Sequence, residues 1–526
     1  MVAQIDAKTV KSWLSDSREV AFLDVREHGQ YGEGHPFHCV PVPYSRFEPE
    51  LVRLVPNLGV RVVLLDDGDG IANRAAAAAE AIGYSNVHVL EGGADGWKRA
   101  GYTLFAGVNV PSKTFGELLE HARHTPRITA AELRREQEAG ANLVVVDGRP
   151  FSEYQRMNIP GGICCPNGEL ALRIGEIAPD PSTRIVVNCA GRTRSIIGAE
   201  TLIALGLPNP VMALENGTQG WFLAGLELER GAARRYGQAP TTKPSLADRA
   251  ASARRLALDC GVRFVDAGEV SRWLGEAGRT TFLLDVRTPE EFAAGSAPGF
   301  QHAPGGQLVQ ATDQWVGVMR ARIVLADSDG IRAPMMARWL AQLGHDAAVL
   351  EGGIAAGTKL PPATVPRWDA APVTPIAPRE LADAVAGGDV LIVDVRPSMD
   401  FRKSHIPGAV WSIRPRLDRV AAIAAGRRVV LVADRADTAA MAAQELTRLG
   451  IRTVHSLAGG LGGWASAGLP LVSTPGELPD AECIDYLFFV HDRHDGNAEA
   501  ARGYLAWEQG LLAQLDDAER GIFRVA

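Results

Sequence analysis

The chain has 526 residues, 46% of them hydrophobic and 22% charged, with a formal net charge of -8. This length exceeds what one hydrophobic core supports, and the composition favours folded domains throughout rather than long disordered segments. The charge is mild for the length and the arginines are scattered, which argues against a nucleic-acid-binding surface. The sequence therefore predicts a multidomain globular protein with no nucleic-acid partner.

The start of the chain, MVAQIDAKTVKSWLSDSREVAFLDVRE, carries charges every few residues, and no later run reaches the roughly 18 apolar residues that a membrane helix needs. We therefore expect a cytoplasmic protein without a membrane partner. The six cysteines show no CxxC spacing, so we expect neither a disulfide framework nor a bound metal, and no cofactor motif is present. They are Cys39, Cys164, Cys165, Cys189, Cys260 and Cys483.

Four related segments recur along the chain, each a short apolar run that ends in Asp-x-Arg. An aromatic residue stands seven positions after each aspartate, and in three segments a Pro-Gly pair begins thirteen positions after it. Such regular self-similarity indicates internal repeats. The segments are AFLDVREHGQYGEGHP, VVVDGRPFSEYQRMNIPGG, FLLDVRTPEEFAAGSAPG and LIVDVRPSMDFRKSHIPGA, with aspartate and aromatic residue at Asp24 and Tyr31, Asp147 and Tyr154, Asp285 and Phe292, and Asp394 and Phe401.

Each segment is followed by a second apolar run, a small-residue turn and an alanine-rich helical pattern. A glycine then stands where a left-handed residue commonly ends a helix, and a third apolar run leads into a motif such as LEGGADGW. Short strands that alternate with helices indicate a parallel sheet covered by helices on both faces. The predicted fold class is α/β, repeated four times, with the helix-ending glycines at Gly83, Gly206, Gly344 and Gly450.

The repeats predict four tandem domains and a C-terminal extension. The proline-rich KLPPATVPRWDAAPVTP before the fourth domain predicts a stiff, extended spacer. In the extension, AEAARGYLAWEQGLLAQLDDAERGIF has the pattern of an amphipathic helix, which we expect to dock on a neighbouring domain. The predicted boundaries are 1–110, 125–232, 260–365, 372–475 and 480–526.

Cys189 occupies a position that the repeats allow us to compare. It lies seventeen residues before the helix-ending glycine and 42 residues after the Asp-x-Arg aspartate. The same counts reach Asp66 in the first repeat and Asp327 in the third, whereas in the fourth they disagree and leave Ala433 or Asp434 as the equivalent. The second repeat alone places a thiol there.

The sequence after Cys189, AGRTRS, favours an anion-binding loop. A strand end that leads through a tight loop into a helix is where doubly wound sheets bind ligands. Successive N–H groups of residues 190 to 195 can form an anion-binding nest, and two arginines add positive charge that favours a thiolate and attracts an anion. We predict Cys189 as the nucleophile, with Ala190, Gly191, Arg192, Thr193, Arg194 and Ser195 as substrate-binding residues.

These features resemble the rhodanese family of sulfurtransferases. The resemblance rests on the Asp-x-Arg strand ends, the Pro-Gly turns, CAGRTRS at 189–195 and the LEGG or LENG motifs, and it covers most of the chain. It implies four tandem rhodanese domains and thiosulfate sulfurtransferase activity. The loop cysteine would take sulfane sulfur from thiosulfate, a small anionic donor, hold it as a persulfide, and pass it to a thiophilic acceptor such as cyanide, a low-molecular-weight thiol or a protein.

Other interpretations of Cys189 stay open. It could be a buried, inert cysteine at a strand end, a common fate for free cysteines. A cysteine phosphatase would need Cys-x5-Arg, but Ser195 stands six positions after the cysteine and Arg194 comes one place early. The chain could also be a relay scaffold that carries sulfur between partner proteins, or a sulfurtransferase that uses mercaptopyruvate or a polysulfide. The sequence gives no oligomeric state.

The corresponding loops of the other repeats predict inactive domains. Asp66 and Asp327 could each accept the N–H groups of their own loop, as a built-in anion. Calcium binding is the alternative, but the glutamate that an EF-hand needs eleven positions later is absent. The fourth domain has no thiol at the matching place, so we expect a structural or docking role.

Two further features of the second repeat have competing interpretations. Cys164 and Cys165 follow the Pro-Gly-Gly turn and could resolve a persulfide or disulfide with Cys189, although packing beneath the loop is favoured. Asp147 and Arg149 recur in every repeat, including those without the thiol, so we predict a structural role for them. The tryptophans of the GW motifs, Trp97, Trp221 and Trp464, are expected to pack at the ends of their domains.

Overall fold

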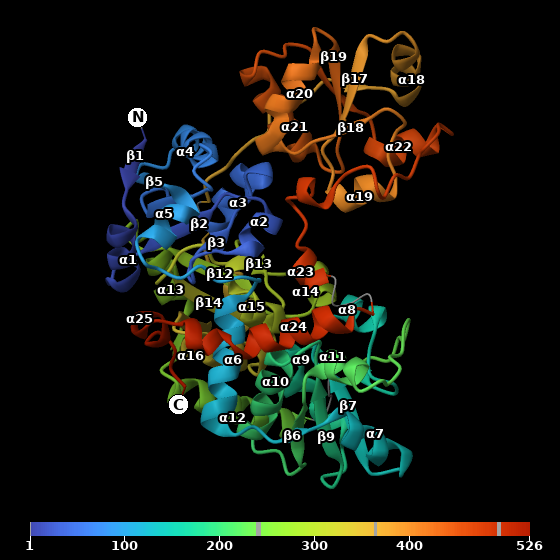
Figure 1. The fold of residues 1–526 in the computed structure, drawn as a ribbon. Coiled ribbons are helices and arrows are strands. Elements are labelled where there is room, and N and C mark those ends of the chain that lie inside the picture. The colour runs from blue at the N-terminus through green and yellow to red at the C-terminus, as the bar shows by residue number, and fades with distance from the viewer. Residues whose placement is uncertain (1, 238–242, 362–364, 492–495, 526) are drawn as a thin grey trace. The chain divides into compact units, whose positions relative to one another are not determined.

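The computed structural model describes residues 2–237, 243–361, 365–491 and 496–525. The chain forms two compact units (Figure 1). One unit contains the first and fourth repeats and the other contains the second and third, so the repeat that shares a unit with the first is the most distant from it in sequence. The first unit consists of Met1–Lys11, Phe22–Ala106 and Val365–Phe488. The second unit consists of Ser12–Ala21, Gly107–Thr364 and Phe489–Ala526.

Each repeat forms one five-stranded sheet with the strand order 1-5-4-2-3, counted within the repeat. The central strands are apolar and buried, and each is followed by a helix that crosses over to the next parallel strand. The predicted α/β class with four parallel sheets is therefore confirmed. The strands are β1 (Ala3–Ile5), β2 (Val20–Asp24), β3 (Val40–Pro41), β4 (Arg61–Leu65), β5 (Val87–Leu90), β6 (Arg127–Ile128), β7 (Leu143–Asp147), β8 (Ile163–Cys164), β9 (Arg184–Asn188), β10 (Val211–Leu214), β11 (Arg263–Val265), β12 (Thr281–Asp285), β13 (Gln301–His302), β14 (Arg322–Ala326), β15 (Asp346–Leu350), β16 (Pro375–Ile376), β17 (Val390–Asp394), β18 (Val410–Trp411), β19 (Arg428–Val432) and β20 (Val454–Leu457).

Helices flank the sheets of the first and fourth repeats. Short 3₁₀ turns η1 (Tyr44–Arg46) and η3 (Arg414–Arg416) precede the third helix of each repeat, and η4 (Asp480–Glu482) follows the fourth. The α-helices are α1 (Ala7–Ser15), α2 (His28–Glu33), α3 (Phe47–Leu54), α4 (Ile71–Ile82), α5 (Gly93–Arg99), α18 (Pro378–Ala386), α19 (Ser398–Lys403), α20 (Leu417–Ala424), α21 (Ala436–Arg448) and α22 (Gly460–Ser466).

The second and third repeats have the same plan, with α6 and α12 as additional helices before each of them. Among the described residues, no helix is both long enough and apolar enough to cross a membrane. The elements are α6 (Val110–Arg123), α7 (Ala130–Glu138), α8 (Phe151–Arg156), α9 (Asn167–Ile177), α10 (Thr193–Ala204), α11 (Gly217–Leu223), α12 (Lys243–Asp259), α13 (Ala267–Leu274), α14 (Pro289–Ala294), α15 (Gly305–Gln310), η2 (Thr312–Gln314), α16 (Arg332–Gln342) and α17 (Gly353–Gly357).

The Asp-x-Arg motif ties each second strand to the loop that follows it. Arg149 Nε lies 2.9 Å from Asp147 Oδ1, and its Nη2 lies 2.7 Å from Asp147 Oδ2 and donates to the Met157 carbonyl at 2.6 Å. The other three repeats make the same bidentate pair. In each of them the arginine also donates to the backbone carbonyl eight residues further on, from Arg26, Arg287 and Arg396. Because repeats without the thiol keep this arrangement, its role is structural, as predicted.

The glycines and tryptophans of the repeat pattern also serve the fold. All four helix-ending glycines have a positive φ, 72° at Gly206 and 93° at Gly344 for example, as the left-handed end of a helix requires. The tryptophans of the GW motifs are buried, and each donates its indole N–H to a backbone carbonyl six residues later. The predicted left-handed helix ends and the predicted packing of these tryptophans are therefore confirmed.

A buried ion pair joins the first and fourth repeats within their unit. Arg414 Nη2 lies 2.7 Å from Glu48 Oε1, and both side chains are at most 5% exposed. Beside this pair, the Tyr44 hydroxyl donates to Glu445 Oε2 at 2.8 Å. A buried charge is costly without its partner, so each of these repeats depends on the other to complete its interior.

The C-terminal extension differs from its prediction in one respect. The expected single helix is wrong, because α24 (Ala498–Gln509) ends before Gly510. The short helix α23 (Phe488–His491) precedes α24, and η6 (Leu511–Gln514) and α25 (Asp517–Arg520) follow it. The capping box of Asp516 and Glu519 starts a new helix where the sequence pattern had suggested continuation. The expected docking is present, since α24 packs against α6 and α11.

Candidate active site

Cys189 lies between the end of β9 and the start of α10, as predicted. Its carbonyl accepts the Thr218 N–H at 2.9 Å, and the preceding Asn188 donates to Asp147 Oδ2 at 2.9 Å. The cysteine is 2% exposed, and its thiol lies 3.6 Å from Ser195 Oγ, which itself donates to the Arg192 carbonyl at 2.7 Å. The loop is therefore held from both the strand and the helix side.

The loop of the first repeat contains a carboxylate where this loop contains the thiol. Asp66 Oδ1 accepts the Gly68 N–H at 2.8 Å, and its Oδ2 accepts the N–H groups of Gly70 at 3.1 Å and Ala72 at 2.9 Å. The side chain is 3% exposed. Three backbone donors thus converge on one anion, which is the geometry of an anion-binding nest.

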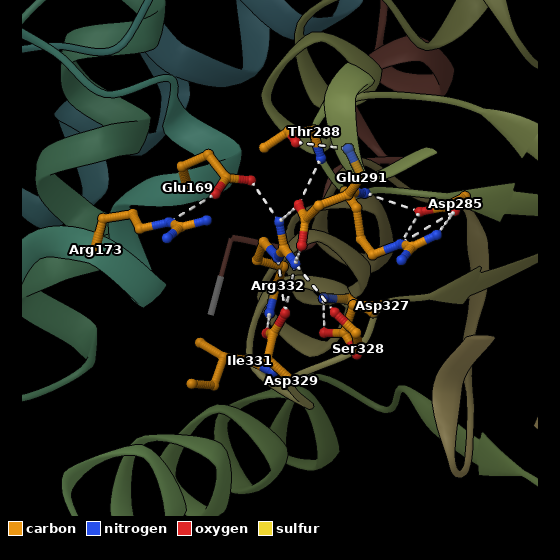
Figure 2. A network of polar contacts seen from close by, with 12 residues as sticks. Glu169, Arg173, Asp285, Thr288, Glu291, Asp327, Ser328, Asp329, Ile331 and Arg332 are labelled. Carbon is orange, nitrogen blue, oxygen red and sulfur yellow. Dashed lines mark hydrogen bonds and ion pairs between the residues drawn. The ribbon is translucent and has the colours of Figure 1, made fainter. Parts of the chain in front are cut away.

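The loop of the third repeat also contains a carboxylate, which accepts two backbone N–H groups, and Arg332 lies beside it (Figure 2). Asp327 Oδ1 accepts the Gly330 N–H at 2.9 Å, and Oδ2 accepts the Ala333 N–H at 2.8 Å. Burial, together with the neighbouring Asp329, raises the pKa of Asp327 to about 7. The carboxylate oxygens of both sister loops thus accept N–H groups of their own loop, as predicted.

The fourth repeat resolves the choice between two equivalents of Cys189. In each repeat the glycine that begins the last helix lies against the carbonyl of the residue at the thiol position: Gly217 against Cys189, Gly93 against Asp66, and Gly353 against Asp327. In the fourth repeat the corresponding Gly460 lies against Ala433. Ala433 is therefore the equivalent residue, and its methyl side chain offers neither a nucleophile nor an anion.

The N–H groups of the Cys189 loop are available for an anion. Gly191, Thr193 and Ser195 stand at the positions whose N–H groups bind the carboxylate in the first repeat. In the described part of the chain, these three N–H groups have no backbone or side-chain acceptor. The positive end of α10 adds to their attraction for negative charge.

Arg192 lies at the loop but is engaged by acidic residues of α6. Its Nε lies 2.6 Å from Glu117 Oε1, its Nη2 also pairs with Glu120, and its Nη1 lies 3.4 Å from Asn216 Oδ1. Burial disfavours the guanidinium, but the paired carboxylates outweigh it and raise the pKa of Arg192. A hollow of about 590 Å³, which Glu117, Glu120 and Arg192 help to line, opens beside this cluster.

Arg194 interacts electrostatically with Cys189. Its guanidinium binds both oxygens of Glu153, at 2.9 and 2.8 Å, and reaches Gln307 Oε1 at 3.4 Å. Burial opposes its charge, yet Glu153 and, more weakly, Cys189 raise the pKa of Arg194. The charge of Arg194 therefore acts on Cys189, while its hydrogen bonds hold it in place.

The two other cysteines of this domain are packed thiols. Cys164 and Cys165 are fully buried, and the Cys164 thiol donates to the Arg149 carbonyl at 3.5 Å. Burial raises the pKa of Cys164 to about 12 and that of Cys165 well above its usual value. Both groups are therefore disfavoured as thiolates, which supports the packing interpretation over a resolving thiol.

Helix α24 of the C-terminal extension contributes residues that the sequence analysis missed. A methyl group built on Gly191 would meet Glu508 Oε2 at 3.0 Å, the Tyr504 ring at 3.7 Å and Leu505 at 3.9 Å. Thr193 Oγ1 donates to Glu508 Oε1 at 2.6 Å. The sequence contained one signal for this role. Glu508 lies four positions after Tyr504, which lies three after Ala501, so a charged residue shares a helix face with apolar ones.

The fold and the site together define a class of protein: tandem α/β domains in which a strand end leads through a tight loop into a helix, with a thiol in one of the four loops. The model of the rhodanese-like domain matches this chain four times, over residues 6–100, 129–224, 266–359 and 377–467. The chain belongs to the rhodanese family.

Several known proteins are similar to this chain. A solved structure of a thiosulfate sulfurtransferase from Pseudomonas aeruginosa is 42% identical, with a TM-score of 0.92 and coverage of 100% of both chains. An HTH-type transcriptional regulator from Mycobacterium tuberculosis is 41% identical over 105 residues, which are 20% of this chain and 45% of the regulator. An uncharacterized protein from Synechocystis is 34% identical over 100 residues, 19% of this chain and 56% of that protein. The chain thus spans about half the length of the curated relatives it matches.

Proposed function

We propose that the chain is a thiosulfate sulfurtransferase that moves sulfane sulfur to a thiophilic acceptor through a persulfide on Cys189. The observation that carries this proposal is the exchange of a carboxylate for a thiol at one of three otherwise matching loops. Membership of the rhodanese family and the full-length likeness to the thiosulfate sulfurtransferase from Pseudomonas aeruginosa support it.

In the first half-reaction, the Cys189 thiolate attacks the outer sulfur of thiosulfate. A bond forms between the two sulfurs, the sulfur–sulfur bond of thiosulfate breaks, and its electron pair leaves with sulfite. The terminal sulfur of the persulfide then carries the negative charge. The N–H groups of Gly191, Thr193 and Ser195 correspond to those that bind a carboxylate in the first repeat, so they can stabilise this charge.

In the second half-reaction, an acceptor such as cyanide or a thiol attacks the terminal sulfur. The bond to the Cys189 sulfur breaks, and the thiolate is regenerated without any external oxidant or reductant. Arg194 supplies a fixed positive charge to the thiolate and to the anionic donor, while Arg192, through Glu117, fixes the shape of the loop. All six cysteines are free thiols, which suits a reducing compartment such as the cytoplasm.

The test is thiosulfate-to-cyanide sulfur transfer by the intact chain, combined with mass analysis for a one-sulfur adduct. We expect wild type to form the adduct and turn over, and Cys189→Ser to do neither. Cys260→Ser is a matched control, because that thiol lies in the third repeat and outside every loop described above. Full activity in Cys189→Ser would refute the site.

A second candidate function differs in the donor and in the acceptor. Both loop arginines are already paired with carboxylates, and the thiol is buried, which favours a less charged donor such as a polysulfide or mercaptopyruvate, or a relay of sulfur between partner proteins. An adduct that forms from polysulfide but not from thiosulfate would favour this candidate. In either case we propose that the first, third and fourth domains are inactive, because none has a thiol at the loop position.

A further inference from the structure

The C-terminal extension places an acidic side chain on the loop that holds the thiol. Glu508 belongs to α24, which packs against α6 and α11. Its Oε2 approaches the backbone of Gly191, and its Oε1 accepts the Thr193 hydroxyl at 2.6 Å. A segment outside the four repeats therefore completes the surroundings of Cys189.

One oxygen of this carboxylate is buried without a partner. Glu508 is 2% exposed, and no donor among the described residues reaches its Oε2. A buried carboxylate oxygen without a hydrogen bond is costly, and an apolar residue would fill the same space on this helix at less cost. The oxygen that faces the loop thus has an unused capacity to accept a hydrogen bond.

The charged residues around Glu508 come from two elements, helix α6 and the Cys189 loop. Helix α6 brings Glu117 and Lys113, whose Nζ lies 4.5 Å from the centroid of the Tyr504 ring, and the loop brings Arg192. Helix α11, with the sequence GTQGWFL, brings no ionisable side chain. Thr193 donates to one oxygen and holds it, so the other is left to face the loop.

We propose that Glu508 is a catalytic residue that takes the proton of a thiol acceptor, an inference that rests on the proposed sulfurtransferase function. The acceptor R–SH enters between α24 and the persulfide on Cys189. Its S–H bond breaks, the proton goes to Glu508 Oε2, and its sulfur bonds to the terminal sulfur. The bond between that sulfur and Cys189 breaks and leaves its electron pair on the Cys189 thiolate. R–SH, the persulfide anion and the carboxylate thereby become R–S–S⁻, the thiolate and protonated Glu508, and the proton then passes to water.

The experiment compares two acceptors on persulfide-loaded full-length protein. 2-Mercaptoethanol must lose a proton, whereas sulfite attacks as an anion. For Glu508→Gln we expect the ratio of thiol discharge to sulfite discharge to fall about 10²-fold near neutral pH, the range for loss of a general base. The deficit should shrink as rising pH supplies the thiolate directly. Glu508→Asp should restore part of the ratio, and Glu499→Gln, an exposed glutamate on the same helix, should leave it unchanged.

Two results would overturn the proposal: an equal fall in discharge to both acceptors, or a deficit that is the same at every pH. Thermal unfolding of each variant separates a folding defect from a chemical one. If thiosulfate fails to load wild type, the proposed donor is wrong, and the persulfide is then loaded with polysulfide. The two discharge rates still test Glu508 in that case.

Discussion

Arg332 of the third repeat forms an ion pair with Glu169 of the second, with 2.9 Å between Nη1 and Oε1 (Figure 2). Both side chains are buried, at 1% and 6% exposure. Arg332 also pairs with Glu291 and Asp329 of its own repeat, so one guanidinium serves three carboxylates. The position of Arg332 next to the Asp327 loop corresponds to that of Arg194 next to Cys189, since each lies five residues after the loop aspartate or cysteine.

Arg332→Met should destabilise this unit by about 3 to 5 kcal/mol, because it leaves buried carboxylates without their cation. Urea unfolding followed by tryptophan fluorescence measures the change. Arg254→Met is the matched control, since Arg254 pairs with Glu351 at an exposed site and should cost at most about 1 kcal/mol. Equal effects of the two substitutions would contradict the role assigned to burial.

Cys189→Asp should give the loop of the second repeat a carboxylate at the position where the first and third repeats have Asp66 and Asp327. The new carboxylate would accept the N–H groups of Gly191, Thr193 and Ser195, which correspond to those that Asp66 accepts, so we expect this variant to be more stable than Cys189→Asn by about 1 to 2 kcal/mol at neutral pH. Thermal or urea unfolding of the two variants checks this, and neither should transfer sulfur. A less stable aspartate variant would show that the loop does not favour an anion.

Arg194→Gln should slow the alkylation of Cys189 by iodoacetamide about 10-fold, since it removes the positive charge that interacts with the thiolate. Arg192→Gln should slow it less, because Arg192 interacts mainly with Glu117 and Glu120, whereas Arg194 also interacts with Cys189. Labelling rates at several pH values, read by peptide mass analysis, measure both effects. The reverse order would reassign the two arginines.

Asp327 should make the stability of its unit depend on pH in a particular direction. Its pKa is raised to about 7 from an ordinary 3.8, so the folded chain binds the proton more tightly than the unfolded chain. This contribution to stability is fully present below about pH 4 and is lost as the pH rises through about 7. The free energy of unfolding of wild type minus that of Asp327→Asn should therefore fall with rising pH.

Urea unfolding between about pH 5 and pH 8 measures this difference, with a slope of at most about 1.4 kcal/mol per pH unit. Burial raises the pKa of Asp313 to about 6, but that group titrates in both proteins and cancels in the difference. A difference that rises with pH, or stays flat, would contradict the assignment.

The sequence was sufficient for features that repeat and insufficient for contacts between distant segments. Comparing four copies predicted the parallel sheets, the structural Asp147 and Arg149 pair and the position of Cys189 at a strand end. It could not predict that Glu117 engages Arg192, or that Glu508 reaches Thr193 from 315 positions away, because such contacts depend on packing between elements. In the fourth repeat the count from Gly450 reached Ala433, but the shorter segment after Asp394 made the second count disagree, and the backbone contact at Gly460 was needed to decide.

The pairing of the first and fourth repeats has a consequence for synthesis on the ribosome. Glu48 and Tyr44 emerge early, but Arg414 and Glu445, their partners, are added after the whole of Gly107–Thr364. Domains generally fold as units in the order in which they are made. All strands of the second and third repeats are therefore synthesised before the first repeat can complete its interior. The Glu48 carboxylate lacks its buried partner Arg414 until the fourth repeat has been synthesised.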